Sequence, residues 1–435
     1  MPKIVNRARQ SQWEAIPMEC ALQKVRDIAQ LFEPQTKQEQ VHLLTGDQIL
    51  AESIHAKENV PKSRTSIKDG YAIISTDGVG IRSVIGVSVA GAPFKNTLKS
   101  GECVRVNTGS VVPDDADAVI QVEDTELVKY DEDKDVELEI CIKEASRVGQ
   151  DIRQPGSEIS IGDLLLDKGC ILRSAEVGLL NAMGIKSVLV YKRARVAIMS
   201  TGNELIDNNK SNNTEIPEGF IRDSNRPQLF LAFNEHGFRS IDNGICIDEP
   251  DKIEQSIIQA AKFAQVIVTT GGVSMGEKDH LKYVLQEKLN FTIEFGRVFM
   301  KPGLPCTVAQ GTIHNKRIVI FALPGNPASA WVCAQLFTVP LLRIMAGHKN
   351  GDHTVIKVKV SNVISLGPRP EYCRAYLETN ENDNHPTAIV TGNQLSARHL
   401  SIVGVQLLLI LPPKTAEKQK IEQGELVNAI IIRKL

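Results

Sequence analysis

Four short apolar runs in the second half of the chain are each followed by a polar loop rich in Gly, Asp, Lys or Pro. The runs are ARVAIMS (194–200), AQVIVTT (264–270), RVFM (297–300) and RIVIFAL (317–323), and the loops are TGNEL, GGVSMGEKD, KPGLP and PGNPASA. Such runs are typical of buried strands and indicate an α/β domain at 191–350. Because loops after parallel strands meet at one edge of an open sheet, we expect one ligand site there.

The rest of the chain predicts further domains, since 435 residues suffice for two to four. Residues 11–65 and 156–190 indicate a connecting part, in which 18–32 has the apolar spacing of a helix. Residues 66–155 change to short β runs broken by Gly, Pro and Asp, which predict a small inserted β domain. Alternating residues over 351–435 are typical of a small β-barrel or sandwich.

Helix boundaries can be predicted from capping residues. In 174–185, Ser174 is the expected N-cap and Gly184 the stop. A second helix begins near Pro227 with an N-cap at one of the three residues 223–225, and Gly237 ends it. A third, amphipathic helix is expected at 249–263.

Composition excludes several classes of protein. A formal charge of −2, with no dense Lys/Arg stripe, predicts no nucleic-acid partner. The acidic run at 131–135 is expected to be a solvated hairpin tip. The eight scattered cysteines predict reduced core residues. The N-terminus lacks an apolar signal region and the run at 405–413 is too short to span a membrane, so we expect no membrane span and a cytoplasmic location.

Two of the four loops suggest an anion site. In PGNPASA a strand leads into a helix, so the N–H groups near Ala328 and Ser329 lie at the positive end of a helix dipole. In GGVSMGEKD the glycines permit close backbone approach, although the loop matches neither the P-loop nor the GxGxxG pattern. An ordinary strand-to-helix turn would contain the same Gly and Pro residues, so either loop alone is weak support.

Charged residues in these loops suggest what the anion would be. Lys301 and Arg297 could neutralise an oxyanion, although a solvated edge lysine is the simpler interpretation of Lys301. Glu204, Asp223 and Asp279 each end a different segment, and alone each would be read as a cap or a surface acid. Together they would repel unless a cation lay among them, so the sequence predicts a Mg²⁺–phosphate site with these three ligands.

Longer strings around these residues resemble the molybdopterin molybdenumtransferase family, which comprises MoeA and the E domain of gephyrin. In the second half the strings are STGNEL (200–205), RDSNRP (222–227), TGGVSMGEKD (270–279), FMKPGLP (299–305) and FALPGNPASA (321–330). In the first half they are KDGYAI (68–73), RVNTGSVVPDDADAVIQVEDTEL (105–127) and GQDIRQPG (149–156). In the last domain they are GPRPEYCRAYL (367–377), TGNQLSAR (391–398) and LPPK (411–414), nearer the gephyrin branch.

The resemblance implies a fold and a reaction. The fold would be multidomain α/β plus β, in which a doubly wound molybdopterin-binding domain (191–350) accompanies the N-terminal dimerisation part, the inserted β domain and a C-terminal β-barrel (351–435). The implied protein is a homodimer that inserts molybdate into adenylylated molybdopterin and releases AMP, with Mg²⁺ as cofactor. No adenylyltransferase domain accompanies the match, so a separate molybdopterin adenylyltransferase is expected to supply the substrate.

The resemblance also implies site residues. The catalytic positions would be Asp69, Thr108, Glu204, Asp223, Asp279, Lys301 and Arg297. The positions that bind molybdate or the adenylylated pterin would be Gly271, Gly272, Ser274, Lys301, Pro302, Gly325, Asn326, Ser329, Arg369 and Ser396. Arg374 is an alternative to Arg369 as the oxyanion ligand, and the odd separation of the two would place them on opposite faces of one β segment. Leu304 stands where many relatives have a lysine, which removes one cation.

Two other functions fit parts of the sequence. Gephyrin-like proteins also act as scaffolds, and a peptide partner would bind near Trp13, Tyr372 and Pro412. Trp13 and Tyr372 are more simply interpreted as packing residues. A scaffold alone would have no physical need for the acids and Lys301, which favours the enzyme. An adenylyltransferase would fit the α/β domain but leave about two thirds of the chain unexplained.

Overall fold

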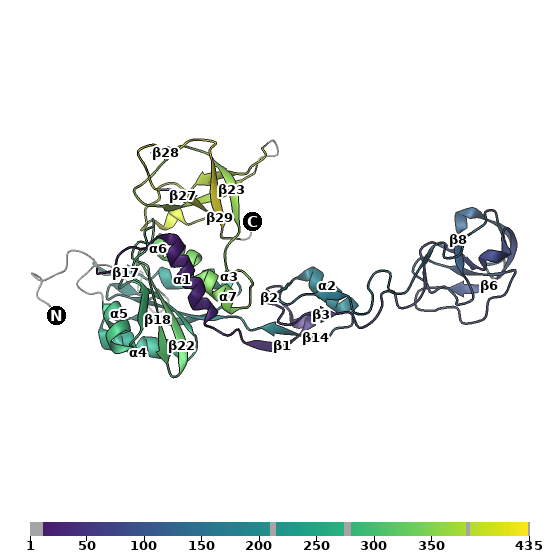
Figure 1. Ribbon diagram of the computed structural model, residues 1–435, viewed down its shortest axis with the longest axis horizontal. Helices are drawn as coiled ribbons and strands as arrows, with labels where there is room; N and C mark the ends of the chain where they lie inside the picture. Colours follow the sequence, from purple (N-terminus) through teal and green to yellow (C-terminus); the bar gives the residue numbers. More distant parts are fainter. Residues whose placement is uncertain (1–11, 209–214, 274–279, 380–382, 434–435) are drawn as a thin grey trace, which may run out of the picture. The chain divides into compact units, whose positions relative to one another are not determined.

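The computed structural model describes residues 12–208, 215–273, 280–379 and 383–433 (Figure 1). These residues form two compact units. The first contains the α/β domain and the C-terminal barrel (1–38, 47–51 and 189–435), and the second contains 39–46 and 52–188. The chain crosses between the units within β1 (Thr36–Gln40) and β14 (Ser187–Tyr191), and again on either side of 47–51. The four-domain boundaries predicted from the sequence stay a prediction.

A six-stranded sheet forms the centre of the first unit. Its order is β18-β15-β19-β22-β21-β20. The bounds are β18 Arg239–Cys246, β15 Arg195–Thr201, β19 Val266–Thr270, β22 Lys316–Leu323, β21 Thr307–Ile313 and β20 Thr292–Phe295. The first four strands are parallel, and β21 and β20 are antiparallel additions. The chain order reverses beside β15, which is the crevice position of a doubly wound sheet.

Helices cover both faces of this sheet (Figure 1). On one face lie α1 (Met18–Gln30), α3 (Asn225–Glu235), α6 (Pro327–Cys333) and α7 (Val339–Met345). The other face is covered by α4 (Pro250–Ala261), α5 (His280–Tyr283) and the π-helical η5 (Val284–Lys288). Alternate residues of β15 enter the two cores, with Val196 and Ile198 on one side and Ala197 and Met199 on the other. This two-sided burial explains why the strands read as continuous apolar runs.

Most predicted elements of this domain are confirmed, and one is wrong. The runs at 194–200, 264–270 and 317–323 are β15, β19 and β22. The run at 297–300 is not a strand, because only Val298 makes an isolated bridge, to Ile16, and the strand β20 precedes it. The N-cap of α3 is Ser224, one of the three predicted residues, and Gly237 follows the helix with a φ of +82°.

The C-terminal domain is a closed barrel, which decides between the two predicted β architectures. Its strand order is β23-β26-β25-β27-β29. The bounds are β23 Val355–Val360, β26 Thr387–Val390, β25 Glu371–Glu378, β27 Leu407–Leu411 and β29 Leu426–Ile431. Alternate residues face two environments: Cys373 and Leu409 fill the barrel interior, whereas Tyr372 and Leu408 join the core that α1, α6 and α7 share with the central sheet.

The second unit contains the predicted β domain as a six-stranded sheet of order β8-β5-β7-β6-β10-β9. The bounds are β8 Ala118–Gln121, β5 Gly70–Ile73, β7 Glu102–Val106, β6 Gly80–Ser88, β10 Val136–Ile142 and β9 Thr125–Asp131. The acidic run at 131–135 is the β9–β10 hairpin tip, as predicted. The helix α2 (Ser174–Ala182) has Arg173 as its N-cap, so the prediction of Ser174 was wrong by one residue. The reason is that the Arg173 backbone N–H donates to Glu176 Oε2 at 2.9 Å.

The remaining elements are short. In the first unit they are β2 Gln48–Ile49, β16 Leu205–Ile206, β17 Ile221–Arg222, η6 Ala334–Thr338, β24 Ile364–Ser365, η7 His399–Ser401 and β28 Lys420–Ile421. In the second unit they are η2 Val41–Leu43, β3 Ile54–His55, β4 Thr65–Ser66, η3 Ser75–Asp77, η4 Val122–Asp124, β11 Ile152–Arg153, β12 Leu164–Leu166 and β13 Ile171–Leu172.

Two composition-based expectations are refined by the fold. All eight cysteines are free, as predicted, but Cys20 is exposed rather than part of a core. The residues Pro327–Met345 form one helix whose length and apolar composition would suffice to cross a membrane. The sequence interpretation overlooked this segment, because its apolar residues are interrupted by Ser, Gln and Thr. Since 83% of its most apolar window is buried inside the protein, it is the kind of helix that also forms protein cores.

A buried histidine cluster beside α7 makes stability depend on pH. Burial, reinforced by the Arg343 charge, lowers the pKa of His353 to about 3 and that of His236 to about 4. His353 Nε2 donates to the Gln335 carbonyl at 2.9 Å, and the two imidazole rings lie 5.7 Å apart. Both rings are therefore neutral in the folded protein at neutral pH.

We expect the free energy of unfolding to fall as the pH drops below about 6.5. In that range the histidines are protonated in the unfolded chain but stay neutral in the folded protein. The contribution is fully present above that pH and is lost progressively toward the folded pKa values. Removing one titrating group by His353→Gln should reduce the loss between pH 7.5 and pH 5 by about 2 kcal/mol. Urea unfolding of both proteins across this range measures it, and identical pH profiles would contradict the assignment.

Candidate functional site

The loops that follow β15, β19 and β22 meet at the carboxyl edge of the sheet, as predicted. The Gly271 N–H donates to the Leu323 carbonyl at 3.1 Å, which joins the second loop to the end of β22. A Cβ on Gly271 would lie 2.4 Å from the Thr201 carbonyl oxygen, and its φ is +88°. A Cβ on Gly325 would lie 3.7 Å from the Gly271 Cα. Only glycine therefore permits the loop at 271 to lie against the end of β15.

We expect Gly271→Ala to destabilise the protein by about 2–4 kcal/mol, since a left-handed backbone and a steric clash are both imposed. The matched control is Gly424→Ala, because Gly424 has a similar φ of +79° but open space around its Cβ position. The control should lose only the cost of a left-handed backbone, about 1 kcal/mol of unfolding free energy. Chemical unfolding of both variants measures the difference in stability. Equal losses would show that a Cβ at position 271 is not opposed by the Thr201 carbonyl.

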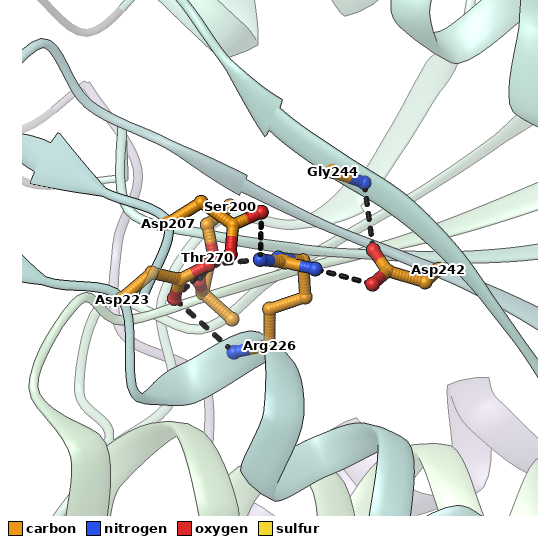
Figure 2. A network of polar contacts seen from close by, with 7 residues as sticks. All are labelled: Ser200, Asp207, Asp223, Arg226, Asp242, Gly244 and Thr270. Carbon is orange, nitrogen blue, oxygen red and sulfur yellow. Dashed lines mark hydrogen bonds and ion pairs between the residues drawn. The ribbon is translucent and has the colours of Figure 1, made fainter. Parts of the chain in front are cut away.

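An arginine surrounded by three aspartates lies beside these loops (Figure 2). Arg226 is almost fully buried, and its Nε donates to Asp223 Oδ2 at 2.9 Å. Its Nη2 lies 2.9 Å from Asp207 Oδ2, and its Nη1 donates to Asp242. Burial alone would lower the pKa of Arg226, but hydrogen bonds and charge attraction from Asp242 and Asp223 outweigh it and raise the pKa. One guanidinium thus joins the start of α3 to the ends of β16 and β17 and to the middle of β18.

The topology explains why these residues meet. The short strands β16 and β17 are parallel, with Leu205 opposite Ile221 and Ile206 opposite Arg222, so Asp207 and Asp223 follow them side by side. Arg226 is three residues after Asp223, in the first turn of α3. Asp242 lies in β18 opposite Ile198 of β15.

Asp223 is committed to protein partners. Its Oδ1 accepts hydrogen bonds from Ser200 Oγ at 2.9 Å and from the Arg226 backbone N–H at 3.3 Å, while Oδ2 accepts from Arg226 Nε. Its side chain is 1% exposed. Ser200 Oγ also lies 2.9 Å from Thr270 Oγ1, which links this carboxylate to the end of β19. The carboxylate therefore bonds to the first turn of α3 and joins two strand ends, and its role as a metal ligand stays a prediction.

Lys301 lies where the α/β domain meets the barrel. Its Nζ is 3.0 Å from both oxygens of Glu371, a buried residue at the start of β25. The Lys301 N–H donates to the Pro370 carbonyl at 2.8 Å and its carbonyl accepts from the Tyr372 N–H at 2.8 Å, so backbone pairing fixes the segment. Arg369 Nη1 donates to the Met300 carbonyl at 2.8 Å. The Lys301 side chain is 41% exposed. Two cations, Lys301 and Arg369, therefore lie near one anion, Glu371.

The barrel also contacts the N-terminus of α6. Ser396 accepts a hydrogen bond from the Ala328 N–H at 3.1 Å through its carbonyl and from Asn326 Nδ2 at 3.0 Å through its hydroxyl. On the other side, Asn225 Nδ2 donates to the Gly325 carbonyl at 2.7 Å. Ser329 is buried within the first turn. The predicted residues Gly325, Asn326, Ser329 and Ser396 are thus brought together.

Other predicted residues are placed as follows. Glu204 is exposed and its carboxylate lies over Gly202, where a Cβ would be 2.7 Å away. Gly272, Pro302 and Arg297 lie in the loops already described, and Arg297 has no acidic partner among residues that the structure describes. Asp69 and Thr108 are in the second unit, where Asp69 Oδ1 accepts from the Thr108 N–H at 2.8 Å. Ser274 and Asp279 lie outside the described residues.

The choice between Arg369 and Arg374 rested on a wrong assumption. Arg369 precedes β25, so the two arginines do not share one β segment. Arg374 is fully buried, its Nη2 donates to the Leu395 carbonyl at 3.4 Å, and burial lowers its pKa. Arg369 is the one that lies beside Lys301, through its bond to Met300.

The aromatic residues considered for a peptide partner are packing residues. The Trp13 ring lies over Gly296, where a Cβ would be 2.5 Å from it. Tyr372 is buried in the core between the barrel and the helices. Pro412 is exposed. These contacts support the packing interpretation of Trp13 and Tyr372, and the peptide partner stays a prediction.

Several residues of the site were missed by the sequence analysis. Arg226 could have been found, since a cation three residues after Asp223 on a helix is an ordinary ion-pair spacing. Asp207, Asp242 and Glu371 gave no local signal, because each meets its partner through tertiary contacts.

Comparisons with known proteins agree on one family. Residues 16–184 match the family described as MoeA N-terminal region (domain I and II), and residues 197–344 match the probable molybdopterin binding domain. Gephyrin from Dictyostelium discoideum is 36% identical over an alignment of 427 positions that covers 88% of this chain and 58% of that protein. The chain therefore spans less than two thirds of that relative.

Two shorter relatives are matched over more of their length. Molybdopterin molybdenumtransferase from Bacillus subtilis is 30% identical, with 88% of this chain and 87% of that protein covered. The solved structure of the molybdopterin biosynthesis MoeA protein from Pyrococcus horikosii superposes with a TM-score of 0.78 and 27% identity, covering 97% of this chain and all of that one.

Proposed function

The chain belongs to the molybdopterin molybdenumtransferase family, and from that premise we propose that it inserts molybdate into adenylylated molybdopterin with release of AMP. The observation that carries the proposal is the pairing of Lys301 with the barrel. It holds a half-exposed ammonium together with the Arg369 guanidinium, which bonds to the Met300 carbonyl.

The charges suit molybdate, a tetrahedral dianion. Lys301 keeps a proton donor free, because its ammonium has three and Glu371 takes at most two. Arg369 presents a guanidinium fork, whose remaining donors can bind a second oxygen. The net charge of Lys301, Arg369 and Glu371 is positive by one, so the group attracts the oxyanion. The same fixed charges would stabilise negative charge that develops as the bond to AMP breaks.

The N-terminus of α6 supplies a place for the second substrate. The Ala328 N–H is bonded to Ser396, but the second amide hydrogen of Asn326 and the Ser396 hydroxyl offer uncharged hydrogen-bond donors to a phosphate near the positive end of the helix. Gly271 and Gly325 let the backbone of neighbouring loops approach closely. We propose that these groups orient the adenylylated pterin, with its phosphates toward Lys301 and Arg369.

For Mg²⁺, the described residues offer a partial fit. Glu204 is an exposed carboxylate with no partner among the described residues, whereas Asp223 is committed to Arg226. Mg²⁺ usually takes one or two carboxylates and completes its shell with water and phosphate oxygens. We propose that Glu204 would hold it, with Asp279 as the second carboxylate, and that Asp223 has a positioning role instead. Bound there, Mg²⁺ would neutralise phosphate charge.

The remaining assignments follow from the family. We propose a homodimer in which Asp69 and Thr108 complete the site, and a separate adenylyltransferase that supplies the pterin. A scaffold role near Trp13 and Tyr372 has less support, since both side chains are packed.

The test is reconstitution. The purified protein, adenylylated molybdopterin and molybdate are incubated, and the product is used to activate a molybdenum enzyme that lacks its cofactor. We expect activation that depends on both substrates. Activation that proceeds equally well without this protein would refute the proposal.

A further inference from the structure

A basic hollow lies at the opposite end of the central sheet from the candidate site. Its volume is about 790 Å³, and it is lined by the first residues of β15, β18 and β22 and by residues just before β19. Because these four strands are parallel, their starts lie together at one edge and their ends at the other. The hollow is therefore separate from the site formed by the strand ends.

The lining is strongly biased in charge. Of its twenty residues seven are lysine or arginine, and the single acid is Glu33. This excess of six positive charges occurs in a protein whose formal net charge is −2. Three of the cations, Lys192, Arg193 and Arg195, are neighbours in the sequence, and the fold adds Lys37, Arg239, Lys262 and Lys316 from distant segments.

Two of these arginines are direct neighbours. Arg195 of β15 and Arg239 of β18 are register partners in the parallel ladder, and both are exposed. Neither has an acidic partner among residues 12–208, 215–273, 280–379 and 383–433. Like charges side by side on adjacent strands cost stability. An anion between them would remove that cost.

Helix dipoles and an ion pair offset part of this excess of positive charge. Helices α1, α3, α4 and α7 end at the hollow, and four helix C-termini carry about two negative charges in total. Asp47 pairs with Arg193 and removes one more. Together these contributions offset about three of the six positive charges.

We propose that this basic hollow binds a small ligand bearing a chain of two or three phosphates, either free or carried by a nucleoside. The volume lies within the range of about 300–1,000 Å³ that small-molecule sites occupy. Arginine forks and lysine point charges match several phosphate groups at once. The amides of Gln35, Asn234 and Gln265 add directed donors and acceptors, and exposed Phe263 offers a face for a base.

Other anionic partners fit less well. A nucleic acid would require cations along a stripe rather than around one hollow. A protein interface would be expected to centre on apolar and aromatic residues, with charges depleted at its middle. The bias toward cations at the centre favours the small polyanion.

The test is calorimetric titration at low ionic strength with tripolyphosphate, ATP and adenosine. We compare the protein with Arg195→Gln/Arg239→Gln, which should weaken binding of tripolyphosphate and ATP by about tenfold or more. Both arginines are exposed, so the double variant should fold. The matched control is Lys357→Gln/Lys414→Gln, which removes the same charge from exposed positions of the barrel and should change the Kd less than twofold.

A third variant, Lys301→Met, separates the two ends of the sheet. Under the proposal, Arg195→Gln/Arg239→Gln weakens tripolyphosphate binding by the same factor in the Lys301→Met background, where the candidate site has lost its ammonium. Equal weakening in both double variants would indicate general charge attraction, and weakening only in Lys301→Met would place the phosphates at the candidate site. Either result would overturn the proposal. It would also be overturned if the protein bound an acidic peptide such as polyglutamate but did not bind tripolyphosphate. Comparison of ATP with tripolyphosphate shows whether the nucleoside contributes.

Discussion

Lys301→Met should lower kcat/KM for molybdate insertion by about 10²–10³-fold, the effect of removing one preorganised donor from developing negative charge. Methionine keeps most of the side-chain stem but removes the ammonium. Steady-state rates of AMP release measure the loss, with circular dichroism to check the fold.

The Lys301→Met variant also removes the counter-ion of Glu371. Glu371 has a side chain only 8% exposed, so it loses its counter-ion and becomes an unpaired buried charge. We therefore expect a loss of stability together with the loss of rate.

The double variant Lys301→Met/Glu371→Gln separates the two effects. It restores neutrality, so most of the lost stability should return, while the rate should stay low. A double variant that recovered both stability and rate would show that Lys301 serves only the fold, and the proposed oxyanion role would be abandoned.

Arg226→Met should lower the free energy of unfolding by about 3–5 kcal/mol, which is typical when one partner of a buried ion pair is removed. Arg226 and Asp223 are 6% and 1% exposed at their side chains, so Asp223 would stay buried without its cation. The strand ends that carry Ser200 and Thr270 are joined through the same carboxylate, so the site should loosen as well. Urea unfolding measures the loss.

Asp242→Asn is the matched control for the same guanidinium. The Asp242 side chain is 48% exposed, so water can replace its contribution and the cost should be below about 1 kcal/mol. If Arg226→Met cost no more than this control, the cluster would be an ordinary surface pairing and its proposed role in holding the site would be wrong.

The sequence predicted the elements that local physics determines. The strands β15, β19 and β22 were found because burial on both faces leaves a continuous apolar run. The run at 297–300 misled the prediction for the same reason, since Val298 and Met300 are buried while the backbone only bridges to other segments. Burial was predicted correctly there, but hydrogen bonding to a neighbouring strand could not be.

The site was predictable in its location and less so in its contacts. Parallel strands bring their following loops together, so the meeting of Gly271 with Thr201 followed from topology. That Lys301 pairs with Glu371, 70 residues later, depends on how the barrel docks, which no local pattern encodes. The pairing of Asp223 with Arg226, three residues later, has an ordinary ion-pair spacing and could have been predicted.

Molybdate-dependent AMP release in a single turnover tests the central claim most directly. The folded protein is mixed with adenylylated molybdopterin in the presence of Mg²⁺, with and without molybdate, and AMP and pterin-bound molybdenum are both quantified. The account predicts AMP and molybdenum cofactor in equal amounts, and only when molybdate is present. A protein that binds the pterin but releases no AMP with molybdate in excess would contradict it.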